Sequence, residues 1–215
     1  MEQSERKALI VVDMLNDFLY KEFNPKLACA NGLQIIPSIK KLAYAAMDSG
    51  VPVIYASDAH LTTDPELKKW GPHAMQGTEG SRVIPELPTK GMYTIERNAR
   101  LDAEKAGSSR IFNVEKGTYS GFFETPLHEL LKLLKVDTVY ITGLHTHICD
   151  RHTTADADFR GYNIFVVKDA VQSFTKQQHE TGLQYIEDVY NAKVKTVDES
   201  IKDFKAENGT MQEKN

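Results

Sequence analysis

Short apolar runs rich in β-branched residues alternate along this chain with longer segments whose apolar residues recur every three or four positions. This alternation constrains the fold more than any other feature, because it is the pattern of strands and helices that follow one another in βαβ units. Several short runs are apolar almost throughout, as in LIVV, VYIT and IFVV. Such runs are typical of parallel strands that are covered by helices on both faces.

The pattern predicts a single doubly wound α/β domain over residues 1–200, with a six-stranded parallel sheet flanked by helices on both faces. The predicted strands are 8–14, 51–57, 110–116, 137–144, 163–170 and 192–197, and the predicted helices are 35–47, 125–134, 148–161 and 176–190. Residues 201–215 are polar and charged, and we expect them to form a C-terminal tail.

Two stretches do not follow this alternation. Residues 58–88 form a long segment rich in Pro, Gly, Thr and His, and long loops inside compact domains are usually functional. Residues 89–109 are polar, with one short alternating run, MYTIER, and a helix-like run, ARLDAEKA. We expect this second segment to be an insertion or a flap.

Charge and cysteine content narrow the functional classes. The 26 Lys and Arg against 30 Asp and Glu give a net charge of −4, and no basic patch stands out. We therefore expect no nucleic-acid or membrane partner. The start of the chain has neither a secretory signal pattern nor an apolar run that approaches the roughly 20 residues of a membrane span. The two cysteines, Cys29 and Cys149, fit a reducing compartment, which favours a cytoplasmic location.

Polar residues that follow strands are the first candidates for chemistry, because ligands of open α/β sheets bind beyond the carboxyl ends of the strands. Asp13, Lys116 and Cys149 end or follow three different predicted strands. A helix N-terminus and a nearby cation both stabilise a thiolate. We therefore predict that Cys149 attacks a carbonyl, that Asp13 transfers the proton, and that Lys116 holds the thiolate. Taken singly, Asp13 also fits a helix cap or a surface charge, and Cys149 also fits a small buried hydrophobe.

The turn after strand 137–144 has two interpretations. Backbone N–H groups of His145 and Cys149 are placed to form an oxyanion hole. Alternatively, His145, His147, Cys149 and His152 form a zinc cluster in which the sulfur is a ligand. The spacing disfavours the cluster, because the chain turns into a helix and supplies no closed fourth ligand downstream.

The long segment 58–88 contains a second constellation of polar residues. Asp58 and His60 are two positions apart, which directs both side chains the same way on an extended chain, and Glu66 and His73 follow. Carboxylate and imidazole ligands suit a divalent ion such as zinc, manganese or iron. The alternative is that these are ordinary solvated loop residues.

Four strings in this order resemble the isochorismatase-like cysteine hydrolases, and most of all the nicotinamidases (pyrazinamidases). The strings are LIVVDMLNDF, SDAH with GPHAMQGTEG, VEKGTYSGF, and TGLHTHICDRHTTADADFRGY, and the resemblance runs from about residue 8 to 197. In this family the position of Leu15 more often carries glutamine, and the positions of His145 and His147 carry small or acidic residues.

The resemblance implies roles for individual residues. It implies a catalytic triad of Asp13, Lys116 and Cys149, and it implies a cis peptide bond between Leu144 and His145. The implied metal ligands are Asp58, His60 and His73, with Glu66 in the place of a further glutamate ligand that some nicotinamidases have. The implied substrate-binding residues are Phe18 and Trp70, which would stack on a pyridine ring, together with Leu144 and His145.

The function expected from this resemblance is hydrolysis of nicotinamide to nicotinate and ammonia through a cysteine thioester, with a divalent metal, zinc first and manganese or iron next, anchoring the ring. The resemblance also implies a homo-oligomer. Two alternatives remain open: a related cysteine hydrolase acting on another small amide or on isochorismate, and a non-catalytic relative that binds small molecules in the same cleft.

Overall fold

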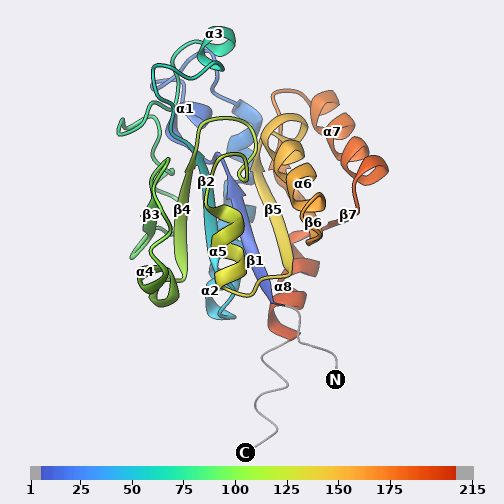
Figure 1. Cartoon of the computed structure of the whole chain (residues 1–215). Helices are drawn as coiled ribbons and strands as arrows, with labels where there is room; N and C mark the ends of the chain where they lie inside the picture. Colours follow the sequence, from blue (N-terminus) through green and yellow to red (C-terminus); the bar gives the residue numbers. More distant parts are fainter. Residues whose placement is uncertain (1–5, 207–215) are drawn as a thin grey trace, which may run out of the picture.

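The computed structural model describes residues 6–206. A seven-stranded sheet in the order β3-β4-β2-β1-β5-β6-β7 lies at its centre, and all neighbouring strands in it are parallel (Figure 1). The strands are β1 (Lys7–Val12), β2 (Val53–Asp58), β3 (Tyr93–Ile95), β4 (Ile111–Lys116), β5 (Thr138–Leu144), β6 (Asn163–Gln172) and β7 (Ala192–Lys195). This confirms the predicted fold class.

Helices cover both faces of the sheet. In Figure 1, α5, α6 and α7 lie on the near face, and α2 and α8 lie on the far face. The helical elements are α1 (Asn16–Leu19), the 3₁₀ segment η1 (Ala30–Ile35), α2 (Ile36–Asp48), α3 (Leu67–Trp70), α4 (Ala103–Ser108), α5 (Leu127–Leu133), the π-helical turn η2 (Thr146–Asp150), α6 (Arg151–Asp158), α7 (Lys176–Val189) and α8 (Val197–Ala206).

The two faces of the sheet carry separate apolar cores, because successive side chains of a strand point to opposite faces. In β1, Leu9 and Val11 pack with residues of α2 and α8, whereas Ala8, Ile10 and Val12 pack with residues of α5, α6 and α7. All five are fully buried. A strand buried on both faces has no polar side, which is why its sequence lacks alternation.

The prediction of six strands was one short. All six predicted strands are present, and the seventh, β3, comes from the segment 89–109, where it pairs with β4 at the edge of the sheet. The same segment contains α4. The expected insertion is therefore part of the sheet, and β3 lies within its short alternating run, MYTIER, which was not predicted as a strand.

The polar tail begins later than predicted. Helix α8 continues to Ala206, and Phe204 is fully buried in the core beside α2. One apolar residue per turn anchors this helix although its outer face is charged. Residues 207–215 of the expected tail lie outside the described residues.

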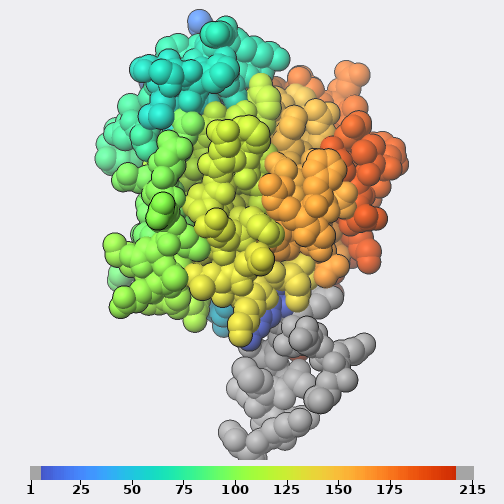
Figure 2. Space-filling view, in the orientation of Figure 1, coloured from blue at the N-terminus to red at the C-terminus, as the bar shows by residue number. Residues whose placement is uncertain are grey.

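The carboxyl ends of the strands are covered by the connection from β2 to β3, which includes α3. Figure 2 shows this connection in blue-green at the top of the molecule. Within residues 6–206, no helix is long and apolar enough to cross a membrane.

Candidate active site

Four adjacent strands bring the predicted catalytic residues together. The sheet order β4-β2-β1-β5 places the ends of these strands side by side, although they are far apart in sequence. Lys116, the last residue of β4, is in register with Asp58, the last residue of β2. Asp13 follows β1 directly and accepts a hydrogen bond from the Asp58 N–H at 2.9 Å. It holds a left-handed conformation (φ 50°), which turns the chain sharply out of the sheet.

Lys116 is the centre of a buried ion cluster. Its Nζ atom lies 2.7 Å from Asp13 Oδ2 and also hydrogen-bonds Asp58 Oδ1, and all three side chains are almost completely buried. Burial lowers the pKa of Lys116, but the two carboxylates outweigh it and raise the pKa well above its usual range. The ammonium group therefore stays charged. The pairing of Lys116 with Asp58 was not predicted from the sequence.

Cys149 lies in the turn η2 and is 5% exposed. Its thiol is within hydrogen-bonding reach of Asp13, so the structure brings all three predicted triad residues together. Burial raises the pKa of this thiol, Lys116 lowers it, and Asp13 and Asp58 raise it; the net pKa is well above the usual range. These surroundings favour the thiol form, whereas the sequence led us to expect a thiolate. The expectation from the sequence took into account Lys116 and the helix N-terminus, which lower the pKa of a thiol. It did not take into account burial or the carboxylates of Asp13 and Asp58, which raise it.

The turn before Cys149 begins with a cis peptide bond between Leu144 and His145, as the resemblance implied. The imidazole of His145 stacks on Phe174, with ring centroids 4.1 Å apart, and meets the ring of Phe18 edge-on at 5.8 Å. Burial lowers the pKa of His145 to about 3, which keeps the ring uncharged.

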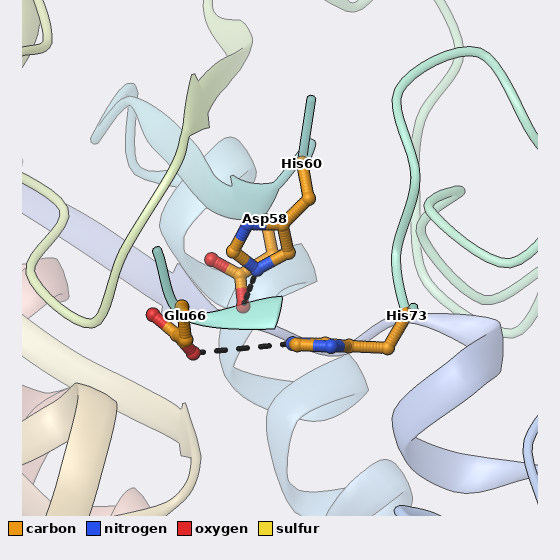
Figure 3. A group of neighbouring side chains, drawn as sticks. All are labelled: Asp58, His60, Glu66 and His73. Atoms are coloured by element: carbon orange, nitrogen blue, oxygen red, sulfur yellow. Dashed lines mark ion pairs between the residues drawn. The ribbon is translucent and has the colours of Figure 1, made fainter. Parts of the chain in front are cut away.

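A second group of polar side chains lies beside this cluster. Asp58, His60, Glu66 and His73 each offer one ligand atom, and these atoms all lie within 4.8 Å of one another. Figure 3 shows the four side chains pointing toward a common centre, with His60 Nε2 3.6 Å from Asp58 Oδ2 and His73 Nε2 3.9 Å from Glu66 Oε1. The structure thus brings all four predicted ligands together.

Hydrogen bonds fix how the two histidines face this centre. His60 Nδ1 donates to Asp64 Oδ2 at 2.9 Å, and His73 Nδ1 donates to the Gly71 carbonyl at 2.8 Å. Since both partners can only accept, each ring in its neutral form presents the lone pair of its Nε2 atom to the other ligands. His60 Nε2 and Glu66 Oε2 are buried without a hydrogen-bond partner. Two imidazoles and two carboxylates arranged in this way fit a divalent transition-metal ion.

An aromatic cleft of about 310 Å³, counted to its open mouth, adjoins both groups. Phe18, Trp70 and His145, three of the residues expected to bind substrate, line it together with Cys149. A wider hollow of about 1300 Å³ shares Glu66 and Tyr119 with the cleft but does not reach Cys149. The residues that line the cleft are Phe18, Leu27, Asp58, Glu66, Trp70, His73, Tyr119, His145, Ile148, Cys149 and Phe174.

Leu144 does not line the cleft. Its side chain is fully buried in the apolar core and packs against Gly32, so we do not carry it forward as a substrate contact. Sequence reasoning missed Tyr119, whose hydroxyl accepts a hydrogen bond from Trp70 Nε1 at 3.1 Å, and Phe174. Both follow the carboxyl ends of strands, so the rule that found Asp13 could have found them. They were passed over because aromatic residues are usually interpreted as core.

The alternative zinc cluster around Cys149 does not form. His147 Nδ1 pairs with Ser173 Oγ at 2.8 Å, and His152 Nδ1 pairs with the Ile148 carbonyl at 2.7 Å. Across residues 6–206, the one group with ligand atoms close enough to hold a metal is that of Asp58.

The isochorismatase domain model matches residues 7–199, so the chain belongs to the isochorismatase family. Three solved structures are similar over almost their whole length. The first is an N-carbamoylsarcosine amidase from Thermoplasma acidophilum, 36% identical with a TM-score of 0.73, covering 90% of this chain and 97% of that one. The second is the nicotinamidase of Bacillus subtilis, 30% identical with a TM-score of 0.71, covering 88% and 98%.

The third is a pyrazinamidase of Pyrococcus horikoshii in complex with zinc, 25% identical with a TM-score of 0.73, covering 89% of this chain and 99% of that one. Membership of the family and these neighbours place the chain among the isochorismatase-like hydrolases, whose solved relatives include amidases.

Proposed function

We propose that this protein is a nicotinamidase-type amidohydrolase that converts nicotinamide to nicotinate and ammonia. The observation that carries the proposal is the four-ligand group of Asp58 directly beside the cleft that holds Cys149. A buried nucleophile next to a metal site and aromatic rings suits a flat amide with a basic ring nitrogen. The similarity to the nicotinamidase of Bacillus subtilis supports the same choice.

We propose Asp58, His60, Glu66 and His73 as ligands of a divalent ion, zinc first and manganese or iron next. The similarity to a pyrazinamidase in complex with zinc supports zinc. When bound, the ion supplies a Lewis acid that anchors the ring nitrogen of the substrate. Phe18, Trp70 and His145 line the cleft around the ring, and this aromatic lining suits a small planar amide.

The chemical steps follow from the contacts of three residues. The Cys149 thiol transfers its proton to Asp13 as the sulfur attacks the carboxamide carbon. Backbone N–H groups of His145 and Cys149 stabilise the oxyanion. Asp13 then returns the proton to the amide nitrogen, the C–N bond breaks and ammonia leaves, with a nicotinoyl thioester on Cys149. Lys116 stays charged throughout, because Asp13 and Asp58 raise its pKa. Its ammonium group holds the Asp13 carboxyl group in place.

Hydrolysis of the thioester uses the same groups in reverse order. Asp13 accepts a proton from a water molecule that attacks the thioester carbon, and the C–S bond breaks. The sulfur regains the proton from Asp13, and nicotinic acid is released and ionises to nicotinate by losing its carboxyl proton to solvent. The cycle consumes one water and leaves Cys149 as a thiol, in agreement with the raised thiol pKa.

A second candidate is an amidase of the N-carbamoylsarcosine type. It is favoured by the similarity to the amidase from Thermoplasma acidophilum, at 36% identity. A small aliphatic substrate of this class has no ring for Phe18 and Trp70 to enclose and no ring nitrogen for a metal to hold. The aromatic lining of the cleft therefore favours nicotinamide.

Ammonia release tests the proposal directly. The protein is assayed with nicotinamide, N-carbamoylsarcosine and benzamide, which lacks the ring nitrogen, with and without prior removal of metal by a chelator. We expect nicotinamide to give the highest kcat/KM, and we expect chelation to remove most of that activity until zinc is restored. Preference for N-carbamoylsarcosine would contradict the proposed substrate. Full nicotinamide activity in metal-free protein would contradict the role of the ion.

A further inference from the structure

Arg97 connects the segment 89–109 to the group of proposed metal ligands. It lies two residues beyond β3, and its Nη1 atom donates to Asp64 Oδ2 at 2.6 Å. The same nitrogen lies 3.3 Å from the Ala59 carbonyl oxygen, and the Arg97 N–H donates to Glu115 Oε2 at 3.2 Å. Arg97 thus joins the carboxyl ends of β2, β3 and β4.

Asp64 is the next link. Its Oδ2 atom accepts from Arg97, from His60 Nδ1 at 2.9 Å and from the Leu61 N–H at 2.9 Å. Asp64 is 8% exposed and the Arg97 side chain is 16% exposed, so solvent screens this chain of contacts weakly. A carboxylate that accepts the Nδ1–H of a ligating histidine fixes the ring orientation and the tautomer.

Gly117 provides the space for Arg97. A Cβ atom at this position would lie 2.3 Å from both Cζ and Nη2 of Arg97, so the guanidinium group occupies the place of the missing side chain. Gly117 directly follows Lys116 at the end of β4. Its φ is not in the left-handed region, so alanine is compatible with the backbone and would displace mainly the flexible end of Arg97.

We propose that Arg97 is a positioning residue for the metal site: it holds Asp64, and Asp64 holds the ring of His60 with Nε2 directed at the other three ligands. The inference rests on the proposed metal site and gives a role to a segment whose sequence indicated none. Arg97 is not one of the four proposed ligands and does not line the cleft at Cys149. Its effect is to keep one ligand in place before the ion binds.

Zinc affinity measured by competition with a chromogenic chelator tests this inference on the metal-stripped full chain. Loss of an outer contact of a ligand costs roughly 10- to 100-fold in metal affinity, and we expect a loss of that size for Arg97→Ala. Gly117→Ala should cause a similar loss although Arg97 is still present. The double variant should be no weaker than Arg97→Ala alone, since both changes remove the same contact.

Two further variants separate positioning from charge and folding. Arg97→Lys keeps the charge but cannot present the planar donor group, so it should recover only part of the affinity. Arg100→Ala removes an exposed arginine of the same segment and should bind zinc as the wild type does. Cobalt-loaded samples give a second readout, because their visible absorption reports the coordination geometry: it should change in Arg97→Ala and not in Arg100→Ala.

The outcomes distinguish this inference from the proposal on which it rests. If wild-type protein binds zinc no better than the His60→Ala variant, the metal site itself is wrong and the inference fails with it. If the wild type binds zinc and Arg97→Ala binds it equally well, only the inference is overturned. Additive losses in the double variant would also overturn it, because Gly117 would then act independently of Arg97.

Discussion

The carboxyl ends of β2 and β5 face the same cleft, and both leave buried polar atoms without a hydrogen-bond partner, but in different surroundings. Around β2, hydrogen bonds fix the Nδ1 atoms of His60 and His73, and the buried unpaired atoms include His60 Nε2 and Glu66 Oε2, which belong to two of the four residues whose ligand atoms lie close together. Around β5, both carboxyl oxygens of Asp150 are buried without a hydrogen-bond partner. Burial raises the pKa of Asp150 well above its usual range, which favours its uncharged form.

This difference indicates separate roles for the residues around β2 and the residues around β5. Unpaired atoms that converge are costly to bury unless an ion satisfies them, so the β2 side is organised for binding. The β5 side buries its nucleophile and holds it by packing, as in the stacking of His145 on Phe174. A nucleophile buried in this way is a thiol at rest and depends on a neighbouring base. Lys116 links the two sides, because its ammonium group pairs with Asp13 and Asp58 and acts on the pKa of the Cys149 thiol.

The largest effect should come from the β5 side. Cys149→Ala removes the sulfur on which the thioester forms, and we expect kcat for nicotinamide to fall on the order of 10⁶-fold, as when other covalent hydrolases lose their nucleophile. Calorimetry should still detect nicotinamide binding, because the metal ligands and the aromatic lining are intact. Cys29→Ala, at the other buried cysteine, is the matched control and should keep near-normal kcat. Residual turnover of Cys149→Ala near the wild-type level would contradict covalent catalysis.

The next effect tests the connection between the two sides. Lys116→Met leaves Asp13 and Asp58 buried without their counter-charge, and breaking a buried ion cluster in this way costs about 3–5 kcal/mol. Urea unfolding of the metal-stripped variant should show this loss. Lys41→Met breaks the exposed pair with Asp198 and should leave the unfolding midpoint nearly unchanged. Equal midpoints for both variants would mean that Lys116 does not hold the cluster together.

The smallest effect should come from the aromatic lining near α3. Trp70→Ala removes one ring from the cleft, and the loss of an aromatic pair, about 0.5–1.5 kcal/mol, corresponds to a rise in KM of roughly two- to tenfold. Trp70→Phe keeps an aromatic ring and loses only the hydrogen bond to Tyr119, so its KM should lie closer to the wild-type value. Steady-state kinetics with nicotinamide measure both. A fall in kcat at constant KM would place Trp70 in the chemistry instead of in binding.

Much of the fold could be predicted because strands buried on both faces carry continuous apolar runs. The residues of β1 and β5 show this directly, since every residue in both is buried. Strand β3 lies inside the alternating run MYTIER, but the run was not predicted as a strand, because so short an alternation with only Ile95 buried does not distinguish a strand from a loop. The last part of α8 was predicted as tail for a related reason. The buried aromatic Phe204 anchors this part of the helix, whereas most exposed positions of the helix are charged.

The site was predictable where residue type alone restricts the chemistry. Asp58, His60 and His73 could be picked out as candidate ligands because few side chains bind divalent ions. Phe174, Asp64 and Arg97 could not, because an aromatic residue, an acid and a base have many roles and only their neighbours select one. Gly143 is a similar case. A Cβ there would lie 2.0 Å from the Val12 carbonyl oxygen, a contact between β5 and β1 that no local sequence pattern indicates.

The sequence by itself determined the alternation of strands and helices, and it determined which side chains are able to attack a carbonyl or bind a metal, since these properties depend on local periodicity and residue chemistry. Only the tertiary structure decided that the ends of β4, β2, β1 and β5 lie side by side, because the order of strands in a parallel sheet is set by how the crossover helices pack. It also decided the direction in which the pKa of Cys149 is shifted, because a pKa depends on burial and on the charges that distant segments bring near.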